Sequence, residues 1–294
     1  MKSKNIVYLA HGGQKYTKQA IFSLYSLLYW LKEEPDNSIG IIVYTDDDTW
    51  VPRHELITAR TISPEQIRQY KGKHQYTHRV KLEILRHAQS MSSGPILFVD
   101  CDTQWIKTPS PALRELAENP KMCWMHQLEG KVSIRNHPDY FTLLSENPSL
   151  SQNFPPPWEM WNSGAIGIPE GNRAFFSETL ETCDQILDFL PHNNWVEQLA
   201  VSLQATKQFE TKSLEPYLLH FWRDSLILPE ALEKALSNLS DDAGSNAKLC
   251  ATFPVEEELR IFRESLKGQW LRKKAKLKRS LSKRRNKFRS WIQL

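Results

Sequence analysis

Short apolar runs alternate with amphipathic stretches along the first 100 residues. Runs at residues 5–10, 38–45 and 95–99 are rich in Ile, Val, Leu and Phe and predict buried β-strands. The stretches at 16–32 and 77–88 repeat apolar residues every three or four positions and predict helices. This β-α-β-α-β order predicts an α/β fold with a mostly parallel central sheet flanked by helices.

The pattern after residue 102 is less regular. It predicts helices at 111–118, 172–190, 194–205 and 229–238, and strands at 121–127 and 217–221. Residues 147–161 are rich in Pro, Ser, Asn and Trp, which predicts an irregular loop that is ordered or closes over a site. Residues 239–246 predict a polar linker, and a helical pattern resumes from 256 to 294.

Two acidic residues, Asp100 and Asp102, directly follow the apolar run at 95–99. Because open α/β sheets bind ligands at the carboxyl ends of their strands, we expect both carboxylates to line a binding crevice. Two such acids can hold a hard divalent cation through oxygen, and the cation keeps positions open for water or phosphate oxygens. The alternative interpretation is a solvated turn, since Asp is common after strands.

Composition limits the class of protein only broadly. A chain of 294 residues forms one large α/β domain or two smaller ones, and its 10 Trp, 12 Phe and 9 Tyr are enough to line a cleft as well as a core. The four cysteines have no paired spacing and no secretory signal ahead of them, so we expect a reduced, cytosolic compartment. The longest apolar stretch, 20–31, is too short for a membrane-spanning helix.

Positive charge is concentrated at the C-terminal end. The chain has a net charge of +4, but residues 267–294 carry 12 Lys or Arg and no Asp or Glu. Trp270, Leu277, Leu281, Phe288 and Trp291 recur at roughly helical spacing with basic residues between them. This pattern predicts an amphipathic helix on an anionic membrane surface. A solvated or protein-binding helix is an alternative, and nucleic-acid binding is the least favoured one.

The order of motifs along residues 5–222 resembles the nucleotide-diphospho-sugar transferases of the GT-A fold, in particular the glycogenin and galactosyltransferase-like group. The segments that carry the resemblance are 6–16, Tyr44-Thr45-Asp46, Val80-Lys81-Leu82, 97–102, Asn162-Ser163-Gly164, Glu197-Gln198 and His220-Phe221-Trp222. The Asp-x-Asp and Asn-Ser-Gly segments are the most specific of these. We therefore predict a Rossmann-like GT-A domain at 1–240, a linker with the start of a helical extension at 241–266, and the basic tail at 267–294.

The resemblance also implies a role for each matching residue. Asp100, Asp102 and His220 would bind Mn²⁺ or Mg²⁺, with Asp100 also close to the donor ribose or sugar. The donor would further contact the loop residues Ala10, His11, Tyr16 and Asp46, the helical Lys81, the strand-entry residues Asn162 and Gly164, and the catalytic pair Glu197 and Gln198. Ordinary structural interpretations exist for His220 as a core histidine, and for Lys81 and the Glu-Gln pair as exposed helix residues.

These roles predict a hexosyltransferase-like glycosyltransferase that moves a sugar from a nucleotide diphosphate, expected to be UDP, to a hydroxyl of a glycan or glycolipid. The metal would neutralise charge on the leaving diphosphate. If the enzyme inverts configuration, Glu197 or Asp46 would take the acceptor proton. Together with the basic tail, this predicts a cytoplasmic protein held peripherally on the inner face of a membrane.

Two other functions compete with this interpretation. A haloacid-dehalogenase-like phosphatase also carries Asp-x-Asp after an apolar strand, but its motif usually continues with Thr or Val where this chain has Gln104. A non-catalytic adaptor on a degenerate transferase fold, bound to membrane or nucleic acid, would tolerate the loss of both acids.

Overall fold

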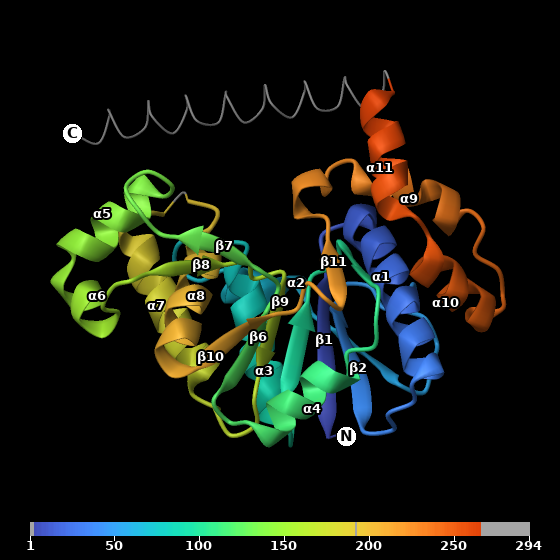
Figure 1. Cartoon of the computed structure of the whole chain (residues 1–294), viewed down its shortest axis with the longest axis horizontal. Coiled ribbons are helices and arrows are strands. Elements are labelled where there is room, and N and C mark those ends of the chain that lie inside the picture. The colour runs from blue at the N-terminus through green and yellow to red at the C-terminus, as the bar shows by residue number, and fades with distance from the viewer. Residues whose placement is uncertain (1–2, 192, 266–294) are drawn as a thin grey trace.

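A computed structural model describes residues 3–191 and 193–265 of the chain (Figure 1). The strands, in chain order, are β1 (Lys4–Ala10), β2 (Ile39–Thr45), β3 (Ile57–Thr61), β4 (Ile96–Val99), β5 (Thr103–Trp105), β6 (Met122–Met125), β7 (Leu128–Lys131), β8 (Glu159–Trp161), β9 (Ala165–Ile168), β10 (Glu210–Ser213) and β11 (Leu218–His220). The helices are α1 (Gln14–Glu33), α2 (Pro64–Tyr70), α3 (Arg79–Met91), α4 (Ser110–Glu118), α5 (Pro138–Glu146), α6 (Pro148–Asn153), α7 (Phe175–Phe189), α8 (Val196–Gln208), α9 (Leu228–Leu236), α10 (Ala243–Thr252) and α11 (Val255–Glu264).

A seven-stranded sheet in the order β10-β6-β9-β4-β1-β2-β3 forms the centre of the molecule. Strand β1 pairs in parallel with β2 and β4, β2 with β3, and β6 with β10, whereas β9 runs antiparallel between β4 and β6. The predicted α/β architecture with a mostly parallel sheet is therefore confirmed. Because β1, β2 and β4 are parallel neighbours, their carboxyl ends meet at one edge of the sheet.

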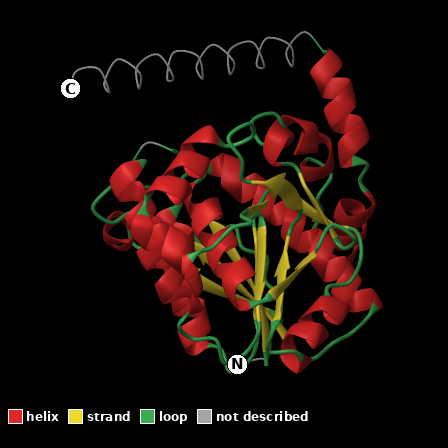
Figure 2. Ribbon diagram, turned by 60° about the vertical axis from the view of Figure 1, so that its left-hand side comes forward, coloured by secondary structure: helices red, strands yellow, loops and turns green. Residues whose placement is uncertain are grey.

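Helices cover both faces of this sheet (Figure 2). Alternate residues of each strand point to opposite faces, so Val7 and Ile42 pack in the cluster that includes α3, α7 and α8. Ile6 and Ile41 pack in a second cluster with α1 and α4. The predicted strands and crossover helices of the first 100 residues thus lie where their apolar patterns place them.

The C-terminal helices form a third cluster outside α1. Residues from α9, α10 and α11 pack with Phe22 of α1, and Figure 1 shows these helices gathered beside it. Helix α10 begins inside the stretch that we predicted to be a polar linker, because the Asp242 carboxylate accepts a hydrogen bond from the Ser245 backbone at 2.7 Å and caps it. Gln104 donates to the Cys250 carbonyl at 2.9 Å and ties this cluster to the sheet.

The loop prediction for 147–161 is wrong in two respects. Helix α6 begins there because Pro148 occupies its first turn and the Asn147 side chain accepts from the Leu150 backbone at 3.0 Å. Strand β8 follows and pairs with β7. Trp158 and other large apolar side chains of this stretch are buried in the main core, so the segment supports the fold and does not cover the site.

The structure also bears on the predictions about the cysteines and about membrane-spanning helices. All four cysteines are free and buried. Among the described helices, none has the length and apolar character needed to cross a membrane. The basic segment 267–294 lies outside the described residues, and the division of the chain into domain, linker and tail stays a prediction.

Candidate metal and donor site

A cavity of about 850 Å³ opens at the carboxyl edge of β1, β2 and β4. Its size suits a small-molecule ligand or cofactor. It is lined by most of the residues that the sequence indicated: His11, Tyr16, Asp46, Lys81, Asp100, Asp102, Asn162, Gly164, Glu197, Gln198 and His220. Ala10 is the exception, because its side chain is buried against Ala20 and Cys101 beneath the edge.

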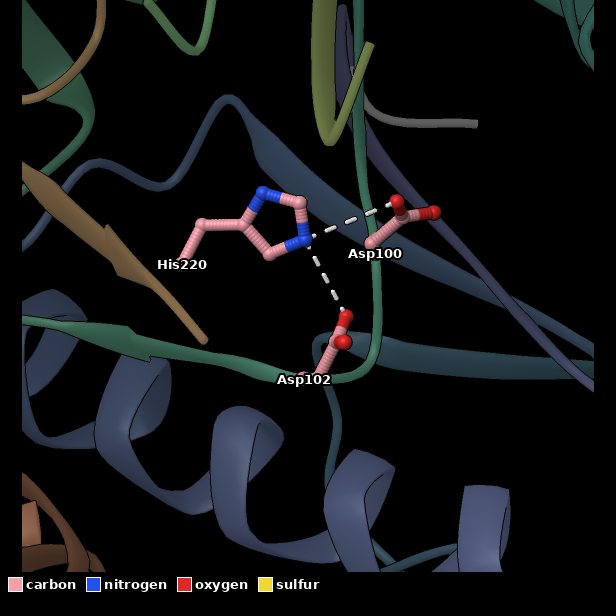
Figure 3. A group of neighbouring side chains, drawn as sticks. All are labelled: Asp100, Asp102 and His220. Atoms are coloured by element: carbon pink, nitrogen blue, oxygen red, sulfur yellow. Dashed lines mark hydrogen bonds and ion pairs between the residues drawn. The ribbon is translucent and has the colours of Figure 1, made fainter. Parts of the chain in front are cut away.

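Asp100, Asp102 and His220 converge at one point of the cavity wall (Figure 3). One ligand atom from each lies within 4.8 Å of the other two. The Nε2 atom of His220 is 3.2 Å from Asp102 Oδ1 and 3.8 Å from Asp100 Oδ2. Two carboxylates and one imidazole form a donor set that fits a divalent cation with open positions.

Local pairing explains how His220 reaches two acids that are 118 and 120 residues away. The two acids lie in the turn between β4 and β5, and β11 pairs antiparallel with β5 so that His220 lies opposite Thr103. The Phe221 backbone also donates to the Asp102 carbonyl at 2.8 Å. The β5–β11 pair therefore fixes the backbone on both sides of the triad.

The triad favours positive charge. Burial opposes the charged form of His220, but Asp102 and Asp100 outweigh it and raise the pKa of the imidazole. Burial also opposes ionisation of Asp102, but the neighbouring His220 outweighs that effect and lowers the carboxyl pKa. Both shifts follow from one attraction, which draws a cation to the point where these groups meet.

Gly164 makes room for His220. A Cβ atom added to this glycine would lie 2.1 Å from His220 Cε1 and 2.2 Å from Nδ1, far inside contact distance. The Gly164 carbonyl accepts a hydrogen bond from the Asp100 backbone at 2.8 Å, which fixes its position. The imidazole thus packs directly on the backbone of the Asn-Ser-Gly segment, and any larger residue would displace it.

Lys81 is a buried cation beside the triad. Its Nζ lies 3.2 Å from Glu197 Oε1 and 3.7 Å from Asp100 Oδ1, and it donates to the Ser163 carbonyl at 3.1 Å. Burial opposes its charge, but Asp100 and Glu197 outweigh burial and raise the lysine pKa, so it stays protonated. Burial raises the pKa of Glu197, and Lys81 offsets part of that rise.

Glu197 is therefore a buried partner of Lys81 and Ser163. Its Oε2 accepts from the Ser163 hydroxyl at 3.0 Å, and only 3% of the residue is exposed. The next residue, Gln198, turns toward the cavity and donates to Glu129 Oε2 at 3.0 Å. The predicted acid-amide pair thus divides into a buried residue that holds Lys81 and a cavity residue that is open to ligand.

The loop after β1 forms the opposite wall. The Gly12 backbone donates to Asp46 Oδ2 at 3.0 Å and joins this loop to the end of β2. Tyr16 is 42% exposed, with its ring available to a ligand, and burial lowers the pKa of His11. This wall has the aromatic and polar groups expected for a nucleotide base, although the assignment stays a prediction.

Three further site residues could hardly be predicted from the sequence. Glu129 lines the cavity and accepts hydrogen bonds from Asn162 at 2.8 Å and from Gln198. His126 packs edge-on against His220 with ring centroids 5.0 Å apart, and Trp195 is 53% exposed at the start of α8. Their only signal is position: His126 lies near the end of the predicted strand 121–127, Glu129 just after it, and Trp195 at the start of the predicted helix 194–205.

Comparison with known proteins adds two structural likenesses. No family model and no curated protein sequence matches the chain. The apo form of mouse xyloside xylosyltransferase 1 is similar with a TM-score of 0.46 and 11% identity, over 71% of this chain and 84% of that one. The galactosyltransferase LgtC, in complex with donor and acceptor sugar analogues, has a TM-score of 0.41 and 12% identity, over 67% and 70%. Both names denote glycosyltransferases, the class that the sequence motifs resemble; the chemistry of the site rests on its own residues.

Proposed function

We propose that this protein is a metal-dependent glycosyltransferase that moves a sugar from a nucleotide diphosphate, UDP in the first instance, to a hydroxyl of a glycan or glycolipid. The observation that carries the proposal is the convergence of Asp100, Asp102 and His220 on a cavity of about 850 Å³ with a buried lysine beside them. An Asp-x-Asp turn alone is common. A third ligand, His220, comes from 118 residues further along the chain, and this long-range convergence favours a preformed metal site.

The donor set accounts for the divalent cation. Asp100, Asp102 and His220 would hold Mn²⁺ or Mg²⁺, and the imidazole favours Mn²⁺ of the two. When bound, such a cation supplies a Lewis acid that neutralises charge on the leaving diphosphate. Lys81 contributes a second fixed positive charge, held in place by Glu197 and Ser163.

The acceptor side has more than one carboxylate. Asp46 and Glu129 both line the cavity and are exposed, whereas Glu197 is buried and paired with Lys81. A general base must reach the proton of the acceptor hydroxyl directly or through one water. The exposed carboxylates meet that requirement better, so we propose Asp46 and Glu129 ahead of Glu197 for this task.

Calorimetric titration tests the donor. The full chain is titrated with UDP, GDP and ADP, each with and without Mn²⁺, and the titrations are repeated with the Asp102→Asn variant. The proposal expects one nucleotide to bind tightly only with Mn²⁺, and Asp102→Asn to lose that binding. If no nucleotide binds in a metal-dependent way, the transferase proposal fails, and release of phosphate from phosphomonoesters becomes the assay to run.

We also propose that the basic segment 267–294 holds the enzyme on an anionic membrane, where a glycolipid acceptor would be found. The support is its 12 Lys or Arg with interleaved aromatic residues and no acid. This would place the protein on the cytoplasmic side as a peripheral protein. Sedimentation with anionic and neutral vesicles tests this proposal, and competition of duplex DNA or RNA with anionic vesicles separates it from nucleic-acid binding, which would take the protein off the lipid.

A further inference from the structure

The side-chain amide of Asn162 is buried and has a partner on every side. Only 3% of the residue is exposed. Its Oδ1 accepts from the Gly164 backbone at 2.9 Å and lies 3.0 Å from His220 Nδ1. Its Nδ2 donates to Glu129 Oε1 at 2.8 Å.

These partners fix which end of the amide is oxygen. A backbone N–H can only donate, so the atom beside Gly164 must be Oδ1, and the atom beside the Glu129 carboxylate must be Nδ2. In the flipped orientation, donor would face donor and acceptor would face acceptor. The same Oδ1 atom therefore faces His220 Nδ1.

The orientation of the amide decides the tautomer of the imidazole. An amide oxygen only accepts, so His220 Nδ1 must carry a hydrogen. Without a metal, Nε2 faces Asp102 Oδ1 at 3.2 Å and Asp100 Oδ2 at 3.8 Å and carries a second hydrogen toward these acceptors (Figure 3). A cation between the two acids would replace that hydrogen and bind Nε2, while Nδ1 keeps its own.

We propose that Asn162 is a positioning residue that holds His220 in the Nδ1–H tautomer so that Nε2 ligates the divalent cation. The inference rests on the proposed function. It gives Asn162 a role in metal binding, in place of the contact with the donor sugar that the sequence resemblance implies. A partner that fixes the second nitrogen of a metal-binding histidine typically supports metal affinity by roughly 10- to 100-fold.

Asn162 could instead matter only because it holds Glu129, and matched variants separate the two roles. Asn162→Leu removes the acceptor for His220 at similar volume. Glu129→Gln alone disturbs only the contact on the other side of the amide. In the double variant Asn162→Asp, Glu129→Gln, donor and acceptor exchange places across the 2.8 Å contact while an oxygen still faces His220 Nδ1.

The first readout needs no metal. Long-range ¹H–¹⁵N spectra of protein labelled in its nine histidines, recorded at a pH where His220 is neutral, report which ring nitrogen carries the hydrogen, and His220→Gln identifies the signal. We expect the Nδ1–H tautomer to be populated in the wild type and in the double variant, and Nε2–H alone in Asn162→Leu. The same tautomer ratio in the wild type and in a folded Asn162→Leu would overturn the proposal.

The second readout is the affinity for Mn²⁺ alone, measured by the paramagnetic resonance of free Mn²⁺. We expect Asn162→Leu to lose roughly 10- to 100-fold in affinity, and Glu129→Gln and the double variant to stay within about threefold of the wild type. If the wild type binds Mn²⁺ and Asn162→Leu binds it equally, the positioning role alone fails. If the wild type binds no Mn²⁺ although the tautomer ratio shifts in Asn162→Leu, metal dependence fails, and the positioning of a metal ligand by Asn162 fails with it.

Discussion

Replacement of Gly164 by alanine is the smallest change that removes a metal ligand without touching one. The added Cβ would lie 2.1 Å from His220 Cε1. Carbon atoms in contact are about 3.5 Å apart, so the ring must move by roughly 1.4 Å. The glycine itself cannot retreat easily, because its carbonyl is bonded to the Asp100 backbone and the next residue, Ala165, pairs with Val99 in the sheet.

The size of the effect follows from that displacement. Metal ligands tolerate shifts of only about 0.2 Å, so a ring displaced by more than 1 Å no longer ligates. A partner that only orients such a histidine is worth roughly 10- to 100-fold in metal affinity, so loss of the ligand itself should cost at least about 100-fold, or about 2.8 kcal/mol of binding free energy. We expect Gly164→Ala to weaken Mn²⁺ binding by at least this factor while the protein remains folded.

Two other glycines serve as controls. In Gly167→Ala the new atom would lie 2.9 Å from Leu116 Cδ1, away from the site, so we expect a loss of stability of about 1–3 kcal/mol with unchanged Mn²⁺ affinity. In Gly244→Ala the nearest atoms are 3.6 Å away, so neither quantity should fall. Mn²⁺ affinity and urea unfolding are measured on all three. Wild-type Mn²⁺ affinity in Gly164→Ala would refute the reasoning.

Three further predictions concern charge. Lys81→Met leaves Glu197 buried without a cation and should cost about 3–5 kcal/mol in urea unfolding, most of which the added change Glu197→Gln should restore; no recovery would contradict the pairing. His126 has its pKa lowered from 6.5 to about 3, by burial first and then by His220, with the Leu218 backbone and Asp102 offsetting only part. Below pH 6.5 the unfolded state binds a proton that the folded state does not, so this residue should cost about 2 kcal/mol of stability between pH 7 and pH 5; the same pH dependence in a folded His126→Phe variant would refute this. A chain that ends at residue 266 should lose binding to anionic vesicles, whereas the full chain should bind them and be released by salt; equal sedimentation of both chains would count against the tail.

The sequence predicted the centre of the fold because local apolar periodicity dominates there. β1, β2 and β4 are runs buried on both faces, and α3 carries a stripe of apolar residues on one side. The errors lie where short-range capping decides the structure. Helix α6 depends on one Asn side chain and one Pro, and α10 on one Asp, which are weak signals within polar or proline-rich stretches.

The candidate site was predictable to different degrees. Asp100 and Asp102 are adjacent in sequence and follow a strand, so their edge position could be derived from the pattern alone. His220 entered through the resemblance, since nothing local indicates that β11 pairs with β5. Glu129 and His126 were missed because each acquires its place only from tertiary contacts, with Asn162 and with His220 respectively.

The charges around the triad explain why a cation suits it. Lys81 is closer to Glu197, at 3.2 Å, than to Asp100, at 3.7 Å, and it also donates to the Ser163 backbone. Its single charge is therefore shared between Glu197 and Asp100. Once His220 gives up its Nε2 hydrogen to a metal, the three carboxylates Asp100, Asp102 and Glu197 and the one ammonium of Lys81 leave two negative charges, which one divalent cation cancels. Because burial penalises any unbalanced charge, a cation that balances these acids should also stabilise the folded protein in proportion to its binding.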